Sequence, residues 1–175
     1  MSLISMRYFR LSVFVSFVVI LASCSSTQSI VSVKEPVSAE KFLSSPFGHD
    51  ESIKSFTKTL PPKTKIRKLV KRNVHYPEKN DTIYQFTYKH SEVIIYKTHF
   101  SREILIAGTV ADSKVEMMNG LKVGITRDQL YQFIKDIKKT GADTLKISTP
   151  DNTRNFNFIF KKDKLTKVMF TSFFD

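Results

Sequence analysis

Cysteine is nearly absent from this chain, and the one that occurs stands close to the N-terminus. The 175 residues contain a single cysteine, Cys24, and no tryptophan. One thiol excludes an internal disulfide framework, so the stability of the fold has to come from packed side chains. A chain of this length falls in the usual range of one domain and can bury an adequate core without cross-links.

Acidic residues are also few. Sixteen Asp and Glu residues stand against 28 Lys and Arg residues, which gives a formal net charge of +12. A surplus of this size favours anionic partners, such as phospholipid head groups, acidic glycans, acidic proteins or nucleic acid. A soluble surface with an ordinary basic bias explains the same composition, and both interpretations stay open at this point.

Recognisable catalytic motifs are missing as well. The sequence has no G-x-S-x-G, no H-E-x-x-H and no P-loop. Of the four histidines, only His90 and His99 have a spacing that would let them approach each other across a hairpin. Two imidazoles without a third ligand make a poor metal site. We therefore expect no enzymatic activity, no metal and no cofactor, and keep an enzyme with an unrecognised site as the alternative.

No apolar run is long enough to cross a bilayer comfortably. The longest, "LSVFVSFVVILA", covers residues 11–22 and follows Arg7 and Arg10. As a helix it would measure about 18 Å, against about 30 Å of membrane hydrocarbon. Basic residues followed by a short apolar run are typical of a secretory signal peptide.

Small residues and the single cysteine come directly after this run. Leu21, Ala22, Ser23 and Cys24 resemble the lipobox of bacterial lipoproteins, in which an invariant cysteine follows an aliphatic, a variable and a small residue. The resemblance implies that residues 1–23 are removed as a signal peptide and that Cys24 carries acyl chains. Two or three acyl chains hold a protein stably at a membrane, whereas one does so marginally. The alternatives are a signal anchor or a plain secretory signal.

The next segment, residues 24–41, is rich in serine and contains Pro36. Such a composition predicts a flexible tether. Ser25 stands where retained lipoproteins have aspartate, and no acidic cluster follows Cys24, so the resemblance implies an outer-membrane protein that faces the periplasm. Nucleic acid is not an expected partner of an exported, lipid-anchored chain.

The remainder, residues 42–175, is predicted to be a single α+β domain that contains two similar segments, 44–100 and 119–175, as possible repeats. In the second segment Thr126 is a plausible helix N-cap, and an apolar stripe runs from Leu130 to Ile137, so we expect a helix that reaches the lysines at 138 and 139. In the first segment Asp50 is the candidate cap of a helix that ends at Pro61.

Period-two alternation follows each helix and predicts strands. The predicted strands cover residues 66–75, 82–89, 92–100, 102–110, 144–149, 155–162 and 165–173. The fold expected is α+β, with two helix-plus-three-strand-meander repeats forming an antiparallel sheet and the helices on one face. Whether the sheet is one continuous layer or two stays open at this point. Two chance copies of a common arrangement are the alternative to a duplication.

A weak family resemblance rests on this pattern. Gly124, Ile125 and Thr126 before a helix, followed by a three-stranded meander, resemble the lipoproteins of outer-membrane assembly and the tandem-repeat beta-lactamase-inhibitor-like fold. The resemblance implies protein–protein binding by an exposed sheet face.

The densest run of positive charge covers residues 63–72, "KTKIRKLVKR". It contains six cations and no acid: Lys63, Lys65, Arg67, Lys68, Lys71 and Arg72. The apolar residues between them fit either a helix face or a strand face. As an edge strand, the lysines would protect against aggregation. As a functional surface, they would bind an anionic component of the envelope.

These features predict a non-catalytic, lipid-anchored envelope protein that acts as a binding module. Its expected partners are the membrane, through Cys24, and another envelope protein or an anionic envelope component. A small periplasmic enzyme and an electrostatic binder of anionic envelope polymers are the alternatives.

Overall fold

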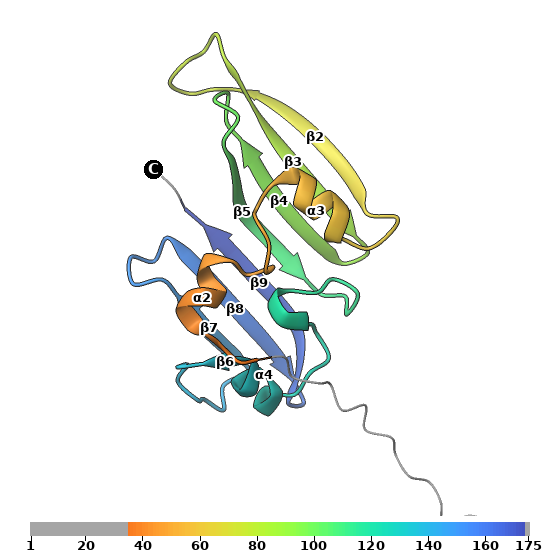
Figure 1. Cartoon of the computed structure of the whole chain (residues 1–175), viewed down its shortest axis with the longest axis vertical. Helices are drawn as coiled ribbons and strands as arrows, with labels where there is room; N and C mark the ends of the chain where they lie inside the picture. The colour runs from red at the N-terminus through yellow and green to blue at the C-terminus, as the bar shows by residue number, and fades with distance from the viewer. Residues whose placement is uncertain (1–34, 174–175) are drawn as a thin grey trace, which may run out of the picture. The chain divides into compact units, whose positions relative to one another are not determined.

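Seven antiparallel strands form the main sheet of the protein (Figure 1). The computed structural model describes residues 35–173. The strands are β2 (Lys65–Arg72), β3 (Asn80–Tyr88), β4 (Ser91–Lys97), β5 (Glu103–Val110), β7 (Thr144–Ser148), β8 (Arg154–Lys161) and β9 (Lys164–Ser172). Their order across the sheet is β2-β3-β4-β5-β9-β8-β7. Each predicted strand is therefore present, and the α+β class is confirmed.

The sheet has two halves, one formed by β2 to β5 and the other by β7 to β9. It is one continuous layer, because β5 pairs with β9. A row of directly opposed residues runs from Phe86 through Val93, Gly108 and Phe170 to Phe156. Opposed residues of neighbouring strands carry their side chains on the same face. The aromatic residues of the two halves therefore belong to one apolar face.

Three short helices cover that face: α2 (Ala39–Ser44), α3 (Ile53–Thr59) and α4 (Arg127–Phe133). Phe42 of α2 packs on Phe156, with ring centroids 5.1 Å apart, and Phe56 of α3 lies 6.1 Å from Phe86. The guanidinium of Arg127, at the start of α4, lies 4.2 Å from the centroid of Phe160. The prediction that the helices lie on one face is confirmed. Residues 35–173 contain no helix with the length and apolar character needed to cross a bilayer.

Helix α3 begins two residues later than Asp50 would require. Its N-cap is Ser52, whose hydroxyl accepts a hydrogen bond from the Ser55 backbone N–H at 3.1 Å. Asp50 accepts from the Ser52 hydroxyl at 2.7 Å, and the hydrogen bonds from Ser55 and Ser52 lower the pKa of Asp50 to about 2. The prediction that Asp50 caps the helix is wrong, because this carboxylate holds the capping serine instead.

Helix α4 is shorter than the sequence predicts. Thr126 is its N-cap, as expected, but the helix ends at Phe133. Ile134 is extended and pairs with Val37 in a two-stranded parallel ladder of β1 (Val37–Ser38) and β6 (Ile134–Lys135). Asp136 has a left-handed backbone, with φ of 62°, which a continuing helix does not allow. The predicted extension of the helix through Ile137 is therefore wrong.

The same ladder corrects the boundary of the tether. Val37 is buried in β1, and α2 starts at Ala39 and buries Phe42. The folded part therefore begins by Val37, so the predicted end of the tether at residue 41 is wrong. The rest of the predicted tether, up to residue 34, and the predicted signal peptide lie outside the described residues.

Candidate functional site: a cationic edge strand

Cys24, which is predicted to carry the lipid, lies outside the part of the chain that the structure describes. The predicted cleavage motif, Leu21, Ala22 and Ser23, lies outside it as well. Their role stays a prediction. The predicted cationic residues, by contrast, are all described.

The basic run forms a strand and not a helix. Residues 65–72 are β2, and Lys63 lies in the preceding turn with φ of 72°. Among the described strands, β3 is the only neighbour of β2, so β2 is an edge of the sheet. All six cations are exposed. The structure thus brings them together along one rim.

The register distributes these charges over both faces of the sheet. Ile66 pairs with Phe86, whose ring faces the helices, so Lys68 and Arg72, at even spacing from Ile66, share the helix side. Lys65, Arg67 and Lys71 point to the opposite face. A ligand that lies along β2 therefore contacts positive charge on both faces of the sheet.

No ion pair within residues 35–173 neutralises these six side chains. The ion pairs of the described residues use other cations, such as Lys89 with Asp112 and Lys97 with Glu103. Lys68 lies 5.8 Å from the centroid of the Tyr84 ring. Asp81, which is opposite Lys71 in the register, is buried and committed to other donors. The positive field along β2 is therefore left for a partner or for solvent ions.

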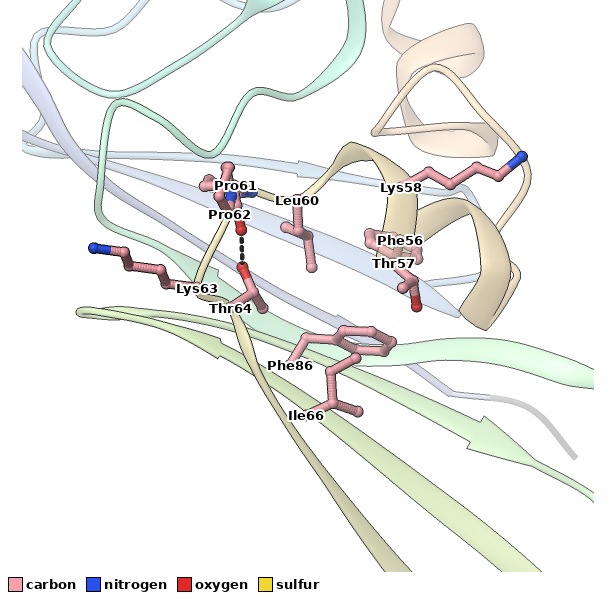
Figure 2. A pocket seen from close by; sticks show the side chains of 10 residues that line it. All are labelled: Phe56, Thr57, Lys58, Leu60, Pro61, Pro62, Lys63, Thr64, Ile66 and Phe86. Atoms are coloured by element: carbon pink, nitrogen blue, oxygen red, sulfur yellow. Dashed lines mark hydrogen bonds between the residues drawn. The ribbon is translucent and has the colours of Figure 1, made fainter.

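Apolar side chains stand between the cations on the helix side of β2. Ile66 is 49% exposed and Val70 is 60% exposed. Next to Ile66 is a cavity of about 350 Å³, which Leu60, Pro61 and Phe86 also line. Figure 2 shows Ile66 and Phe86 on the sheet side of this cavity, with Leu60 and the prolines at 61 and 62 across from them.

The far end of β2 is held by a buried carboxylate. Asp81 accepts hydrogen bonds from the Tyr96 hydroxyl, from Asn73 Nδ2 at 2.7 Å and from the His99 backbone N–H at 2.8 Å. The Tyr96 hydrogen bond is the largest cause that holds the pKa of Asp81 below its ordinary value. Burial, and then the same bond, raise the pKa of Tyr96 to about 12. Because Asn73 directly follows β2, this network positions the strand.

A second cavity, of about 690 Å³, lies between α2 and the turn that joins β7 to β8. Its charged lining residues are Glu40, Asp151 and Arg154. Arg154 donates to the Leu43 carbonyl oxygen at 2.8 Å and forms an ion pair with Glu51 at 2.6 Å. Asp151 also accepts hydrogen bonds from Thr153 within its own turn. Arg154 and Asp151 are thus engaged with the protein itself, so we assign this region a structural role.

The two histidines considered as a pair lie at opposite ends of β4. His90 is in the turn before the strand, and His99 follows it. Seven extended residues separate the ends of β4 by roughly 20 Å, so the sequence-based suggestion that the two imidazoles approach each other is wrong. Within residues 35–173, no three His, Cys, Asp or Glu side chains gather in a way that could hold a metal ion.

Sequence reasoning identified the cations of β2 but missed the cavity beside them and the Asp81 network behind them. The consecutive prolines at 61 and 62 were available as a signal, because a rigid turn before a strand keeps two elements apart. The buried state of Asp81 had no sequence signal, since its donors come from two separate segments, the residue after β2 and the end of β4.

Comparison with known proteins shows no match to a family model, to a curated protein or to a solved structure.

Proposed function

We propose that this chain is a non-catalytic, lipid-anchored protein of the cell envelope that binds another envelope protein through its sheet. The observation that carries the proposal is β2, a strand with one free edge. The six cations of residues 63–72 have no ion-pair partner within residues 35–173. Such a rim next to exposed Ile66 and Val70 combines charge selectivity with apolar contact area. The proposed location is the outer membrane, with the domain facing the periplasm.

The proposed anchor rests on the lipobox pattern that ends at Cys24. Cells that express the full-length chain and are fed labelled palmitate should incorporate label into the wild type and not into Cys24→Ser. Ser25→Ala is the matched control, since it changes the adjacent residue and leaves the thiol. Equal labelling of wild type and Cys24→Ser would remove the anchor from the proposal.

The binding role is tested inside the envelope with a photo-crosslinking amino acid. We expect the reagent at position 68, on β2, to give a discrete adduct, and the reagent at position 146 to give none. Lys146 is a matched control because it is also an exposed lysine on an edge strand, β7, at the other side of the sheet. Absence of any adduct along β2, from position 65 to position 72, would contradict the proposed binding role.

The uncompensated cations also favour a second candidate function, the binding of anionic envelope polymers. Salt separates the two candidates. Attraction between exposed charges is screened within about 8 Å at physiological ionic strength, so a purely electrostatic complex should dissociate steeply as salt rises. A complex that also buries apolar side chains should persist.

We also propose that the two halves of the sheet are repeats, related to the tandem-repeat lipoproteins named above. The support is that α3 and α4 are both seven residues long, each with a hydroxyl N-cap, Ser52 or Thr126. In both helices the residue four positions after the cap is fully buried, Phe56 in one and Leu130 in the other. Replacing residues 126–133 by residues 52–59 should retain a cooperative fold, whereas a scrambled insert should not; equal loss with both inserts would count against the repeat.

A further inference from the structure

We propose that β2 takes up an extended acidic segment of a partner protein as an additional strand of the sheet. This inference rests on the proposed function and specifies its mechanism, because it names the edge, the conformation of the ligand and its chemistry. The segment would pair with the backbone of β2 and place acidic side chains against the cations of residues 63–72. Strand addition of this type draws affinity from main-chain hydrogen bonds and selectivity from side chains.

The backbone of β2 has hydrogen-bonding groups available for such a strand. The Asn73 N–H donates to the Lys79 carbonyl oxygen at 2.9 Å at the end of the hairpin. Bonded and non-bonded positions alternate along an antiparallel pair, so residues 71, 69, 67 and 65 bond to β3. Ile66, Lys68, Val70 and Arg72 therefore turn their N–H and C=O groups towards the free edge.

The strand has the shape that pairing requires. It is eight residues long, contains no proline, and keeps a continuous register with β3. Protected edges are usually short, bulged or interrupted by proline. The strand at the other edge of the sheet, β7, has five residues. Positive charge is thus the feature of β2 that opposes pairing, and a negatively charged strand removes this obstacle.

The side chains along β2 define the chemistry of the added strand. On the face away from the helices, acidic residues would lie beside Lys65, Arg67 and Lys71. On the helix side, apolar residues would lie beside Ile66 and Val70, which are 49% and 60% exposed. The cavity of about 350 Å³ next to Ile66 has room for one such side chain (Figure 2). An alternation of acidic and apolar residues therefore places acids beside three of the cations and apolar residues beside Ile66 and Val70. Lys68 and Arg72, on the helix side, are not matched by an acid of such a segment.

Other occupants fit this edge less well. A second copy of the chain pairing through its own β2 would place cations against cations, which destabilises a strand pair. An anionic lipid or glycan would use the charges but not the outward N–H groups of β2. Those groups and the apolar residues between the charges are the reason to favour a polypeptide.

The test uses the full-length protein in a non-ionic detergent and a short synthetic peptide of alternating glutamate and valine. The wild type should bind the peptide, and a peptide of alternating lysine and valine should not bind. Val70→Pro removes one outward N–H without removing a bond to β3 and keeps every charge, so we expect the affinity to fall at least tenfold. Val70→Thr is the matched control, because it is β-branched and retains the N–H, and its affinity should stay within about threefold of the wild type.

A second measurement guards against misfolding of the proline variant. Glutamate–valine peptides methylated on alternate backbone nitrogens, in both registers, keep their charge but lose the N–H groups of one edge. For the unmodified protein, at least one of the two should bind at least tenfold more weakly than the parent peptide.

Two results would overturn the inference. One is no saturable binding of the parent peptide, and equally tight binding of phosphatidylglycerol vesicles by wild type and Val70→Pro would then assign the cations to lipid. The other is peptide binding that is insensitive to both Val70→Pro and methylation. If an adduct still forms in the envelope from position 68, the proposed binding role survives the loss of strand addition.

Discussion

At the scale of single residues, Gly108 shows how closely β5 approaches its neighbours. A Cβ atom placed there would lie 2.3 Å from Phe170 Cζ and 2.6 Å from the Glu92 carbonyl oxygen. The phenyl ring is fully buried and the carbonyl belongs to the paired strand β4, so neither can move away at low cost. Gly108 is thus the position at which the two halves of the sheet join without room for a side chain.

Gly108→Ala should therefore destabilise the protein by about 3 kcal/mol, as overpacking of a filled interior does. Urea unfolding of the full-length protein measures the change. Gly141→Ala is the matched control, because a Cβ atom there meets no atom within 4 Å. A loss for Gly108→Ala no larger than that of the control would show that the strands separate more easily than the structure implies.

The network around Asp81 gives the protein a pH dependence at each extreme. Because the folded-state pKa of Asp81 is below its ordinary value, the contribution of this carboxylate to the stability of the fold is complete above about pH 4. That contribution is lost as the pH falls through the folded-state pKa. The pKa of Tyr96 is raised to about 12. The contribution of its hydroxyl to stability is therefore complete below about pH 10, the ordinary pKa of tyrosine, and is lost as the pH rises towards 12.

Tyr96→Phe removes the hydroxyl that donates to Asp81. We expect this variant to be less stable than the wild type at neutral pH, and the difference between the two should shrink below about pH 4 and again above about pH 10. Urea unfolding over a pH series measures both limits. A difference that stays constant across the series would show that the pair does not titrate as the structure indicates.

At the scale of elements, α4 illustrates what a local pattern can and cannot predict. The capping residue Thr126 was predictable, because a hydroxyl before an apolar stripe is a local signal. The structure adds a reciprocal bond, in which the Thr126 N–H donates to Gln129 Oε1 at 2.8 Å. The early end at Phe133 was not predictable, because it depends on the pairing of Ile134 with Val37, from a segment nearly a hundred residues away.

Thr126→Ala should cost about 1 kcal/mol, the usual value for loss of a hydroxyl N-cap. Thr126→Ser keeps the hydroxyl and should remain within about 0.5 kcal/mol of the wild type. Thermal unfolding of both variants, with amide exchange of residues 127–133, reports whether the loss comes from the helix. Equal melting temperatures for the two variants would mean that the cap does not limit the stability of α4.

At the scale of the whole domain, Arg154 connects segments that are distant in the sequence. From β8 it donates to the Leu43 carbonyl at the end of α2 and pairs with Glu51 near α3. Its side chain is 19% exposed and that of Glu51 is 18% exposed, so the pair is largely screened from water. This contact fixes α2 to the half of the sheet formed by β7, β8 and β9.

Arg154→Gln should reduce stability by about 2 kcal/mol, because it leaves a partly buried carboxylate without its cation and weakens the bond to α2. Glu51→Gln keeps the bonds from Arg154 to α2 and should cost less. Urea unfolding ranks the variants, and amide exchange at Phe42 and Leu43 should accelerate in Arg154→Gln alone. Unchanged exchange there would show that α2 is held by its apolar contacts without this residue.

The predictions that came from the sequence were local in origin. Alternation of side chains predicted the strands, and the density of positive charge identified the cations of residues 63–72. The lipobox pattern that ends at Cys24 predicts an anchor, and this stays a prediction. Tertiary structure decided which strand lies at an edge, that β5 and β9 join the halves into one sheet, and that Val37 shortens α4. The physical reason is the sequence separation of the contacts involved. The alternation of apolar and polar side chains depends on neighbours in the chain, whereas strand order and a free edge depend on contacts between distant segments.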